Sequence, residues 1–462
     1  MKDLKWLQNV LNFIKKHSRA IIAMVVVISL LLSLSGISSI IALIRASRQV
    51  QSEAPTVSTT VPQSTEPEQT QSAEEQYELA VAYLNEAIVQ TPEDPDLYTQ
   101  RAALHYNLGQ TEEALNDYTT ALALKEDPRT RYLRAIVYST TGNNQAAYED
   151  LTISLQAEPN NRDYMSLMAD ICNALQHYDQ ALEYLEKLLI NEPSNCVLLT
   201  LAGDACVYLQ DFETATTHYA SAIAAYTDSS ESGGISKASL YSAYANALKT
   251  LENFTEAAEA YAQSLSLAES KELYFQRGFC LLQSENYGDA ALDFTKCIEL
   301  EYEVVAAHFQ RALCYYAIGD YGKAIDDFKI YETAFPENAD TFLYLGLCYQ
   351  HTGRYQNAIT YYQKCIAADI SVGNCQFNIG NCYYNLKDYG SAVTYYTRAI
   401  NSGIYVYESL LNRGVSYIQL NKYNEAKVDL KRVIDECKDA SLVESATKSY
   451  DPIKNITIVT KS

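Results

Sequence analysis

Small and bulky side chains recur along this chain with a period of about 34 residues. The pattern occurs ten times between Tyr98 and Asp435, and in each copy an alanine precedes a bulky residue by four positions. A fixed period of this length predicts a solenoid, in which each repeat buries its apolar side only against its neighbours. The alanines are Ala114, Ala147, Ala181, Ala215, Ala257, Ala290, Ala324, Ala358, Ala392 and Ala426, and the bulky residues are Tyr118, Leu151, Leu185, Tyr219, Tyr261, Phe294, Phe328, Tyr362, Tyr396 and Leu430.

Within each repeat, the spacing of apolar positions predicts two antiparallel helices. Phe342, Leu345, Gly346 and Tyr349 recur at the spacing of one helical face, and Gly353 marks the turn that follows them. The small residue before the turn lets the two helices approach closely, and the bulky residue of the second helix fills the space beside it. We therefore expect an all-α chain of helix–turn–helix repeats.

This pattern resembles the tetratricopeptide repeat family over roughly residues 73–436. The signature tryptophan of that family is missing, and Tyr98, Tyr241, Tyr274 or Phe342 stands in its place. The resemblance implies a right-handed superhelical solenoid of about ten repeats that binds peptides on its inner wall.

The repeat pattern and the composition also divide the chain into segments. One interval between successive alanines is 42 residues instead of 33 or 34, because a Ser- and Gly-rich insertion follows the fourth repeat. The expected segments are a basic amphipathic cytoplasmic segment (1–19), a transmembrane helix (20–44), a disordered tether (45–72), a capping helix (73–94), repeats 1–4 (95–228), a flexible insertion (229–237), repeats 5–10 (238–436) and a C-terminal tail (437–462).

Five repeats carry an arginine on the first helix and an aspartate sixteen residues later on the second helix, and the other five carry neither. An unpaired charge near a core is costly, whereas a paired charge is tolerated. We therefore predict an ion pair that joins the two helices of each such repeat; the alternative is that the arginines bind an acidic ligand. The pairs are Arg101–Asp117, Arg134–Asp150, Arg277–Asp293, Arg311–Asp327 and Arg413–Asp429.

Residues 20–44 form a stretch of 25 positions without a charged side chain. As a helix this stretch is about 37 Å long, enough to cross the hydrocarbon core of a bilayer with some tilt. A cleaved signal peptide would have a shorter apolar stretch and small residues at its cleavage site, so we favour an uncleaved anchor. Five basic residues precede the stretch, and Arg45 and Arg48 follow it. The positive-inside rule then places the N-terminus in the cytoplasm and the repeats outside.

The cysteines bear on which compartment holds the repeats. Cys280, Cys314, Cys348 and Cys382 lie 34 residues apart, so they occupy one equivalent position in four repeats, too far from one another for disulfides. We expect buried free thiols there and no metal site. Because free thiols fit an oxidising exterior poorly, either the host lives without oxygen or the array faces the cytosol. The second option resembles the mitochondrial outer-membrane import receptor, but the lysines that form its chaperone clamp are missing here.

Charge and the scattered histidines narrow the functional classes. The formal net charge is −22, and without residues 1–19 it is −26, so nucleic acid is not an expected partner. No nucleophile has a base at a suitable spacing, so we expect neither catalytic residues nor a cofactor.

The expected function is that of a membrane-tethered scaffold or adaptor that binds a protein or peptide on the inner wall. The alternative is a structural, self-assembling membrane component without a separate client, and packing between repeats is the alternative role for the wall residues. The wall is polar in repeats 3–5, with Asp163, Asp170, Asn173, Thr200, Asp204 and Asn246, and apolar in repeats 6–9, where the predicted groove residues are Phe275, Phe279, Leu282, Phe309, Leu313, Tyr316, Leu343, Leu347, Phe377 and Tyr384.

Overall fold

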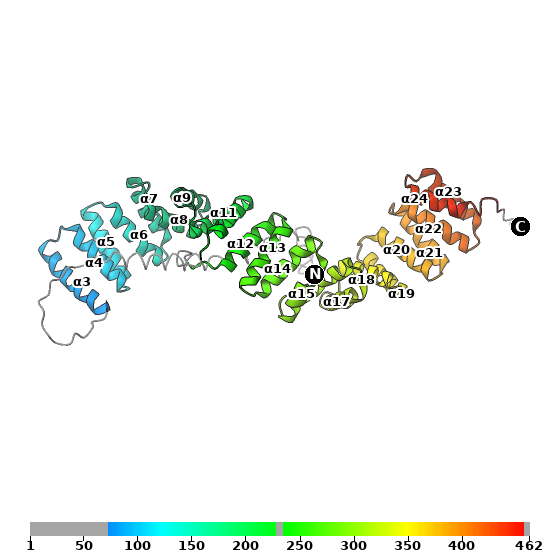
Figure 1. Ribbon diagram of the computed structural model, residues 1–462, viewed down its shortest axis with the longest axis horizontal. Coiled ribbons are helices and arrows are strands. Elements are labelled where there is room, and N and C mark those ends of the chain that lie inside the picture. The colour runs from blue at the N-terminus through cyan, green and yellow to red at the C-terminus, as the bar shows by residue number, and fades with distance from the viewer. Residues whose placement is uncertain (1–72, 228–233, 457–462) are drawn as a thin grey trace, which may run out of the picture. The chain divides into compact units, whose positions relative to one another are not determined.

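The computed structural model describes residues 73–227 and 234–456, and within these ranges it contains 22 α-helices and no strand (Figure 1). The chain forms two compact bodies, an N-terminal body that ends at Leu251 and a C-terminal body that begins at Glu252. In each body, consecutive helices pack against one another as an all-helical solenoid, as the period predicted. The right-handed superhelix stays a prediction.

The helices alternate between a first and a second helix of each repeat. In the N-terminal body they are α3 (Ala73–Gln90), α4 (Pro95–Asn107), α5 (Thr111–Leu124), α6 (Pro128–Thr140), α7 (Asn144–Ala157), α8 (Arg162–Ala174), α9 (Tyr178–Asn191), α10 (Cys196–Tyr208), α11 (Phe212–Ala225) and α12 (Lys237–Thr250). In the C-terminal body they are α13 (Phe254–Leu267), α14 (Lys271–Gln283), α15 (Tyr287–Glu299), α16 (Val304–Ala317), α17 (Tyr321–Ala334), α18 (Ala339–His351), α19 (Tyr355–Ala367), α20 (Val372–Asn385), α21 (Tyr389–Asn401), α22 (Val406–Gln419), α23 (Tyr423–Glu436) and α24 (Ala440–Tyr450).

Helix α24 lies in the segment that the sequence presented as a tail. The Asp439 carboxylate caps its N-terminus by accepting hydrogen bonds from two backbone amides. Ala446 and the following Ile453 are buried with side chains of α22 and α23. The last repeat is therefore covered by a short additional helix.

Four parts of the predicted organisation lie wholly or mostly outside the described residues. They are the basic segment 1–19, the stretch Ala20–Ile44, the tether 45–72 and most of the insertion after the fourth repeat. Among residues 73–227 and 234–456, no helix has the length and apolar character needed to cross a membrane.

The small and bulky positions of the repeat form the core, as the sequence predicted. All ten alanines are fully buried, and the ten bulky side chains are at most 2% exposed. A Cβ atom placed on Gly346 of α18 would lie 2.7 Å from the ring of Tyr362 of α19. The absence of a side chain at Gly346 therefore lets α18 and α19 approach closely enough for the tyrosine to fill the gap.

The predicted ion pairs are confirmed in all five repeats. In each, the arginine Nε and Nη2 atoms donate to the two carboxylate oxygens of the aspartate, at 2.6 to 2.8 Å. The aspartates are only 3–7% exposed. This bidentate geometry satisfies both charges at the boundary between the two helices.

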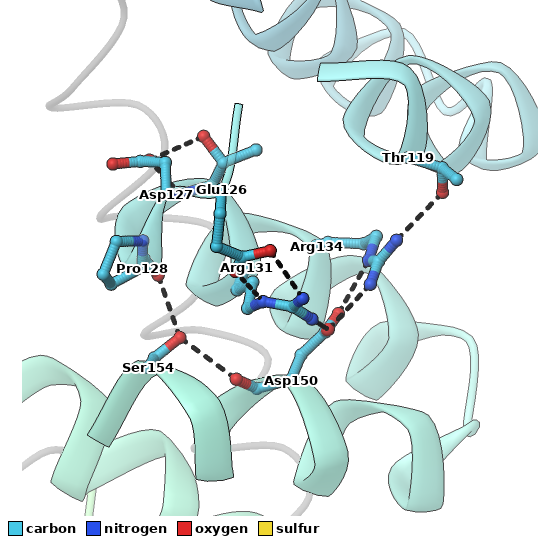
Figure 2. Close-up of polar contacts among 9 residues, drawn as sticks. Thr119, Glu126, Asp127, Pro128, Arg131, Arg134, Asp150 and Ser154 are labelled. Carbon is cyan, nitrogen blue, oxygen red and sulfur yellow. Dashed lines mark hydrogen bonds and ion pairs between the residues drawn. The ribbon is translucent and has the colours of Figure 1, made fainter. Parts of the chain in front are cut away.

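Four of the arginines also reach the preceding repeat. Figure 2 shows Arg134 of α6 between Asp150 of α7 and Thr119 of α5, whose hydroxyl accepts a hydrogen bond of 3.0 Å from Nη1. At Arg277 the equivalent residue of the preceding helix is Ala262, which has no side-chain acceptor. Each complete set therefore links three helices of two repeats; the acceptors are Asn85 for Arg101, Thr119 for Arg134, Thr295 for Arg311 and Thr397 for Arg413.

A repeat without the ion pair uses another polar link to its neighbour. In the eighth repeat, Tyr361 of α19 takes the place of the aspartate, and Lys329 of α17 contacts its hydroxyl. Glu332 of α17 accepts a hydrogen bond of 3.0 Å from the same hydroxyl and one of 2.8 Å from Lys364. The contact between neighbouring second helices thus replaces the contact within a repeat.

We predict that Asp327→Ala destabilises the protein by about 3–5 kcal/mol, because the half-buried Arg311 then has no carboxylate partner. The double replacement Arg311→Leu with Asp327→Tyr, which copies the eighth repeat, should recover most of this loss. Chemical unfolding of the single and double variants gives the coupling energy. Asp326→Ala, at an exposed neighbouring position, is the control, and additive losses at positions 311 and 327 would contradict the prediction.

Candidate protein-binding surface

The ten predicted groove residues all lie on first helices of the C-terminal body, and we call them together the apolar wall. All ten side chains are half-buried: none is fully buried in the core and none is fully exposed to solvent. They come from four successive first helices: Phe275, Phe279 and Leu282 from α14, Phe309, Leu313 and Tyr316 from α16, Leu343 and Leu347 from α18, and Phe377 and Tyr384 from α20.

Three aromatic residues of the apolar wall double as packing groups. Phe309 of α16 contacts the buried ring of Phe328 at a centroid distance of 5.6 Å and the ring of Tyr331 at 4.5 Å. Phe275 and Phe377 make the same two kinds of contact in their own repeats, the first with Phe294 and Tyr302 and the second with Tyr396 and Tyr405. The packing alternative therefore accounts for one side of each of these rings.

Two other aromatic members of the apolar wall contact neighbouring repeats. The ring of Phe279 meets that of Phe254, from the preceding second helix, edge-on at 6.1 Å. Tyr316 contacts Tyr321 of its own repeat and Tyr344 of the next repeat, at 5.7 and 5.3 Å. Side chains of the apolar wall therefore also take part in the packing between repeats.

Acidic residues accompany the apolar wall. The first turns of α14, α18 and α22 contain Glu272, Asp340 and Glu408. There the negative carboxylates also interact favourably with the positive end of the helix dipole. No lysine or arginine occupies an inner-wall position of α14, α16, α18, α20 or α22. A bound segment would therefore meet apolar side chains and negative charge.

One of the polar residues predicted for the inner wall of the N-terminal body, Asp204, forms a buried hydrogen bond. Asp204 of α10 is 9% exposed, and its carboxylate accepts a hydrogen bond of 2.6 Å from the hydroxyl of Tyr219 of α11. Burial raises the pKa of Asp204 to about 6, although the hydrogen bond from Tyr219 opposes the rise. Burial also raises the pKa of Tyr219, so the phenol stays protonated.

This pairing of a polar group with a buried tyrosine was missed from the sequence, although a signal exists. In the ninth repeat, the Tyr396 hydroxyl donates to Asn381 at 2.8 Å, in the same relative positions as Tyr219 and Asp204. The eighth repeat has the apolar Leu347 at this position, and there the Tyr362 hydroxyl donates to Gln350 instead, at 2.7 Å. Asp204 is therefore first of all the partner of a buried hydroxyl.

The cysteines are free thiols, and the predicted series of equivalent cysteines is fully buried. Burial raises the pKa of Cys348 to about 12, so its thiol is protonated and unreactive at neutral pH. In the part of the chain that the structure describes, no group of three histidine, cysteine or acidic residues is placed to hold a metal ion.

Comparisons with known proteins concern the repeats. Profiles described as tetratricopeptide repeat match residues 337–402, residues 281–339, and the three stretches 95–128, 238–271 and 407–439. The human tetratricopeptide repeat protein 13 is 34% identical over 83 residues, which are 18% of this chain and 10% of that protein. The chain thus aligns with about a tenth of the length of this curated relative.

Several solved structures match the chain at low sequence identity. The Naa15/Naa10 complex bound to HypK has a TM-score of 0.42 and 14% identity, covering 81% of this chain and 63% of the matched chain. Yeast Tom70 has a TM-score of 0.31 and 15% identity, covering 82% and 92%. YrrB, a repeat protein with an unusual peptide-binding site, has a TM-score of 0.35 and 19% identity, covering 40% and 92%.

We predict that Asp204→Asn stabilises the protein at pH 7.5 by up to about 3 kcal/mol and has little effect at pH 3.5. The pKa of Asp204 is about 6 in the folded protein and 3.8 in an ordinary setting. Stability from this group is therefore fully present below pH 3.8 and is lost as pH rises through 6. The asparagine still accepts the hydrogen bond from Tyr219 but never ionises.

The measurement is the free energy of unfolding of variant and wild type across this pH range. Tyr219→Phe is the companion variant, since removal of the donor should raise the pKa of Asp204 further and extend the loss of stability to higher pH. A stability difference between Asp204→Asn and wild type that does not change with pH would contradict the assignment.

Proposed function

We propose that this chain, a tetratricopeptide repeat protein, is a membrane-tethered adaptor that binds peptides or proteins along the apolar wall of its C-terminal body. The observation that carries this proposal is the run of half-buried apolar side chains on four successive first helices. Monomeric proteins rarely keep such a strip in contact with water without a use for it. We propose no catalytic activity.

The chemistry of the apolar wall indicates the kind of segment that fits. Half-buried rings and leucines favour an extended or helical segment with regularly spaced apolar anchors. The carboxylates of Glu272, Asp340 and Glu408 favour lysine or arginine beside those anchors, because opposite charges raise the rate of encounter. A partner segment that is both apolar and basic is therefore our proposal.

The tether is proposed from the sequence. The uncharged stretch Ala20–Ile44 is long enough for one membrane crossing, and residues 45–72 have a composition typical of flexible linkers. With the basic residues before the crossing in the cytoplasm, the repeats lie on the extracytoplasmic side. A reach on the order of 30 Å would let the array sample the space beside the membrane.

Self-assembly without a separate client is the second candidate function. It is favoured by apolar side chains that the first described helix exposes, among them Tyr83, which is 73% exposed.

For the apolar wall, we test the double variant Phe279→Ser with Leu313→Ser by proximity labelling from a tag beside Gln51. We predict that the amount of labelled partner protein falls at least tenfold relative to wild type. Both changes replace an apolar anchor with a small polar group. The matched control is Leu292→Ser, which removes a side chain that is 68% exposed on α15 and outside the apolar wall. Circular dichroism checks that both variants fold, and an unchanged set of labelled partners would rule out the apolar wall as the binding site.

For the tether, we predict that deletion of residues 20–44 moves the chain from the membrane fraction to the soluble fraction. Protease added outside intact cells should digest the repeats of the full chain and spare a tag at its N-terminus. Repeats that stay protected until the cells are opened would place the array in the cytosol instead.

A further inference from the structure

Helix α3 has the features of a second helix, and no first helix precedes it among the residues that the structure describes. Ala80 and Leu84 stand at the alanine and bulky positions of the repeat, and Leu84 is buried beside α4. Figure 1 shows α3 as the first coloured helix of the N-terminal body, next to α4. Ala80 is only half-buried, whereas all ten equivalent alanines are fully buried. The side of α3 that other repeats cover with a first helix is therefore open.

Apolar residues occupy this open side. Tyr83 is 73% exposed and stands at the position where five repeats bury an aspartate and the eighth repeat buries Tyr361. Leu79 is 65% exposed, and none of the ten repeats has a large apolar residue at its position. The equivalents of Leu79 are Glu113, Ala146, Gln180, Thr214, Glu256, Asp289, Lys323, Asn357, Ser391 and Glu425. Leucine at this position is thus specific to α3.

The segment that directly precedes α3 has a composition unsuited to a covering helix. The segment 46–72, directly before α3, is rich in Ser, Thr, Gln, Glu and Pro, and Pro55, Pro62 and Pro67 interrupt it. Such a composition is not typical of an amphipathic helix. We therefore consider a partner molecule as the source of the cover.

The other end of the array differs from α3 in the character of its outer surface. On α24, the exposed side chains include Glu444, Ser445 and Lys448, while Ala446 is buried. A polar outer face is what a terminal helix needs in order to remain in water. Among the two described terminal helices, α3 exposes large apolar side chains, whereas α24 exposes none.

We propose that the open side of α3 pairs with α3 of a second copy of this chain. Ala80 and Ala87, seven residues apart and both half-buried, form a small-residue track that lets two helices approach closely, with Tyr83 and Leu79 filling the space beside it. A two-fold axis makes such a surface self-complementary.

The pairing is weak in solution and gains strength when the copies share a membrane. One helix pair buries less than the about 1,200 Å² of a stable interface. The segment that leads to the proposed anchor enters α3 directly, so anchored copies would bring their α3 helices together at high effective concentration. This gain in strength rests on the proposed tether, whereas the pairing surface does not. Glu86, exposed on the turn after Tyr83, brings like charges together, so added salt should strengthen the dimer.

The test is disulfide crosslinking of the full chain in membranes, in a Cys437→Ser background that leaves only buried native thiols. Copper phenanthroline is the oxidant and takes up the two electrons that two thiols release as their S–S bond forms. Tyr83→Cys should give a covalent dimer at least five times faster than Val89→Cys. Val89 is the matched control, because it is 82% exposed on the same helix but points away from the open side.

Faster dimer formation by Tyr83→Cys, further accelerated by salt, supports the pairing. Equal rates at the two positions, no dimer at either, or a mixed disulfide with a different protein would overturn it. A second measurement keeps the test independent of the new cysteine: Tyr83→Lys should abolish concentration-dependent self-association of the detergent-solubilised chain in sedimentation. The binding of partners by the apolar wall should survive Tyr83→Lys, so failure of the pairing and failure of the proposed adaptor function give different results.

Discussion

A helical hairpin of this kind cannot bury its apolar side alone, and the whole structure follows from that constraint. Each fully buried alanine, such as Ala324, lets its helix pass close to its neighbours, and each bulky ring, such as Phe328, fills the space that results. The ion pairs obey the same logic. Arg311 binds Asp327 within its repeat and Thr295 in the preceding repeat, so a charge at the edge of the core also fixes one hairpin against another.

Much of this could be predicted from the sequence, because the deciding contacts recur at fixed spacing. Arg277 and Asp293 are sixteen residues apart in the sixth repeat, as in four others, so their pairing is visible without coordinates. Contacts between repeats were harder to predict, since the acceptor is Asn85 for one arginine and a threonine for three others, and for Arg277 the equivalent residue is Ala262, which offers no side-chain acceptor. Helix α24 escaped prediction because its sequence departs from the period, and a tail without a repeat pattern gives no signal of what it covers.

The candidate site could be predicted less well for a physical reason. Position along a first helix tells which residues share a face, but not how much of each ring its neighbours already cover. Phe309 illustrates this, because Phe328 and Tyr331 both contact its ring. The same atoms that stabilise the stacking of repeats therefore also form the surface offered to a partner. A bound segment would add contacts to a strip that the fold has already positioned, and little ordering cost would remain at the wall side.

The two ends of the array decide what kind of self-association is open to it. A solenoid whose last helix resembled the first in apolar character would join end to end and grow into a filament. Here Lys448 and Glu444 keep the outer side of α24 polar, while Tyr83 leaves the outer side of α3 apolar. When two α3 helices pair, each covers the apolar side of the other. No further copy can then bind there, so the assembly stops at a dimer. The polar cap thus limits assembly at one end and leaves the other end free to pair.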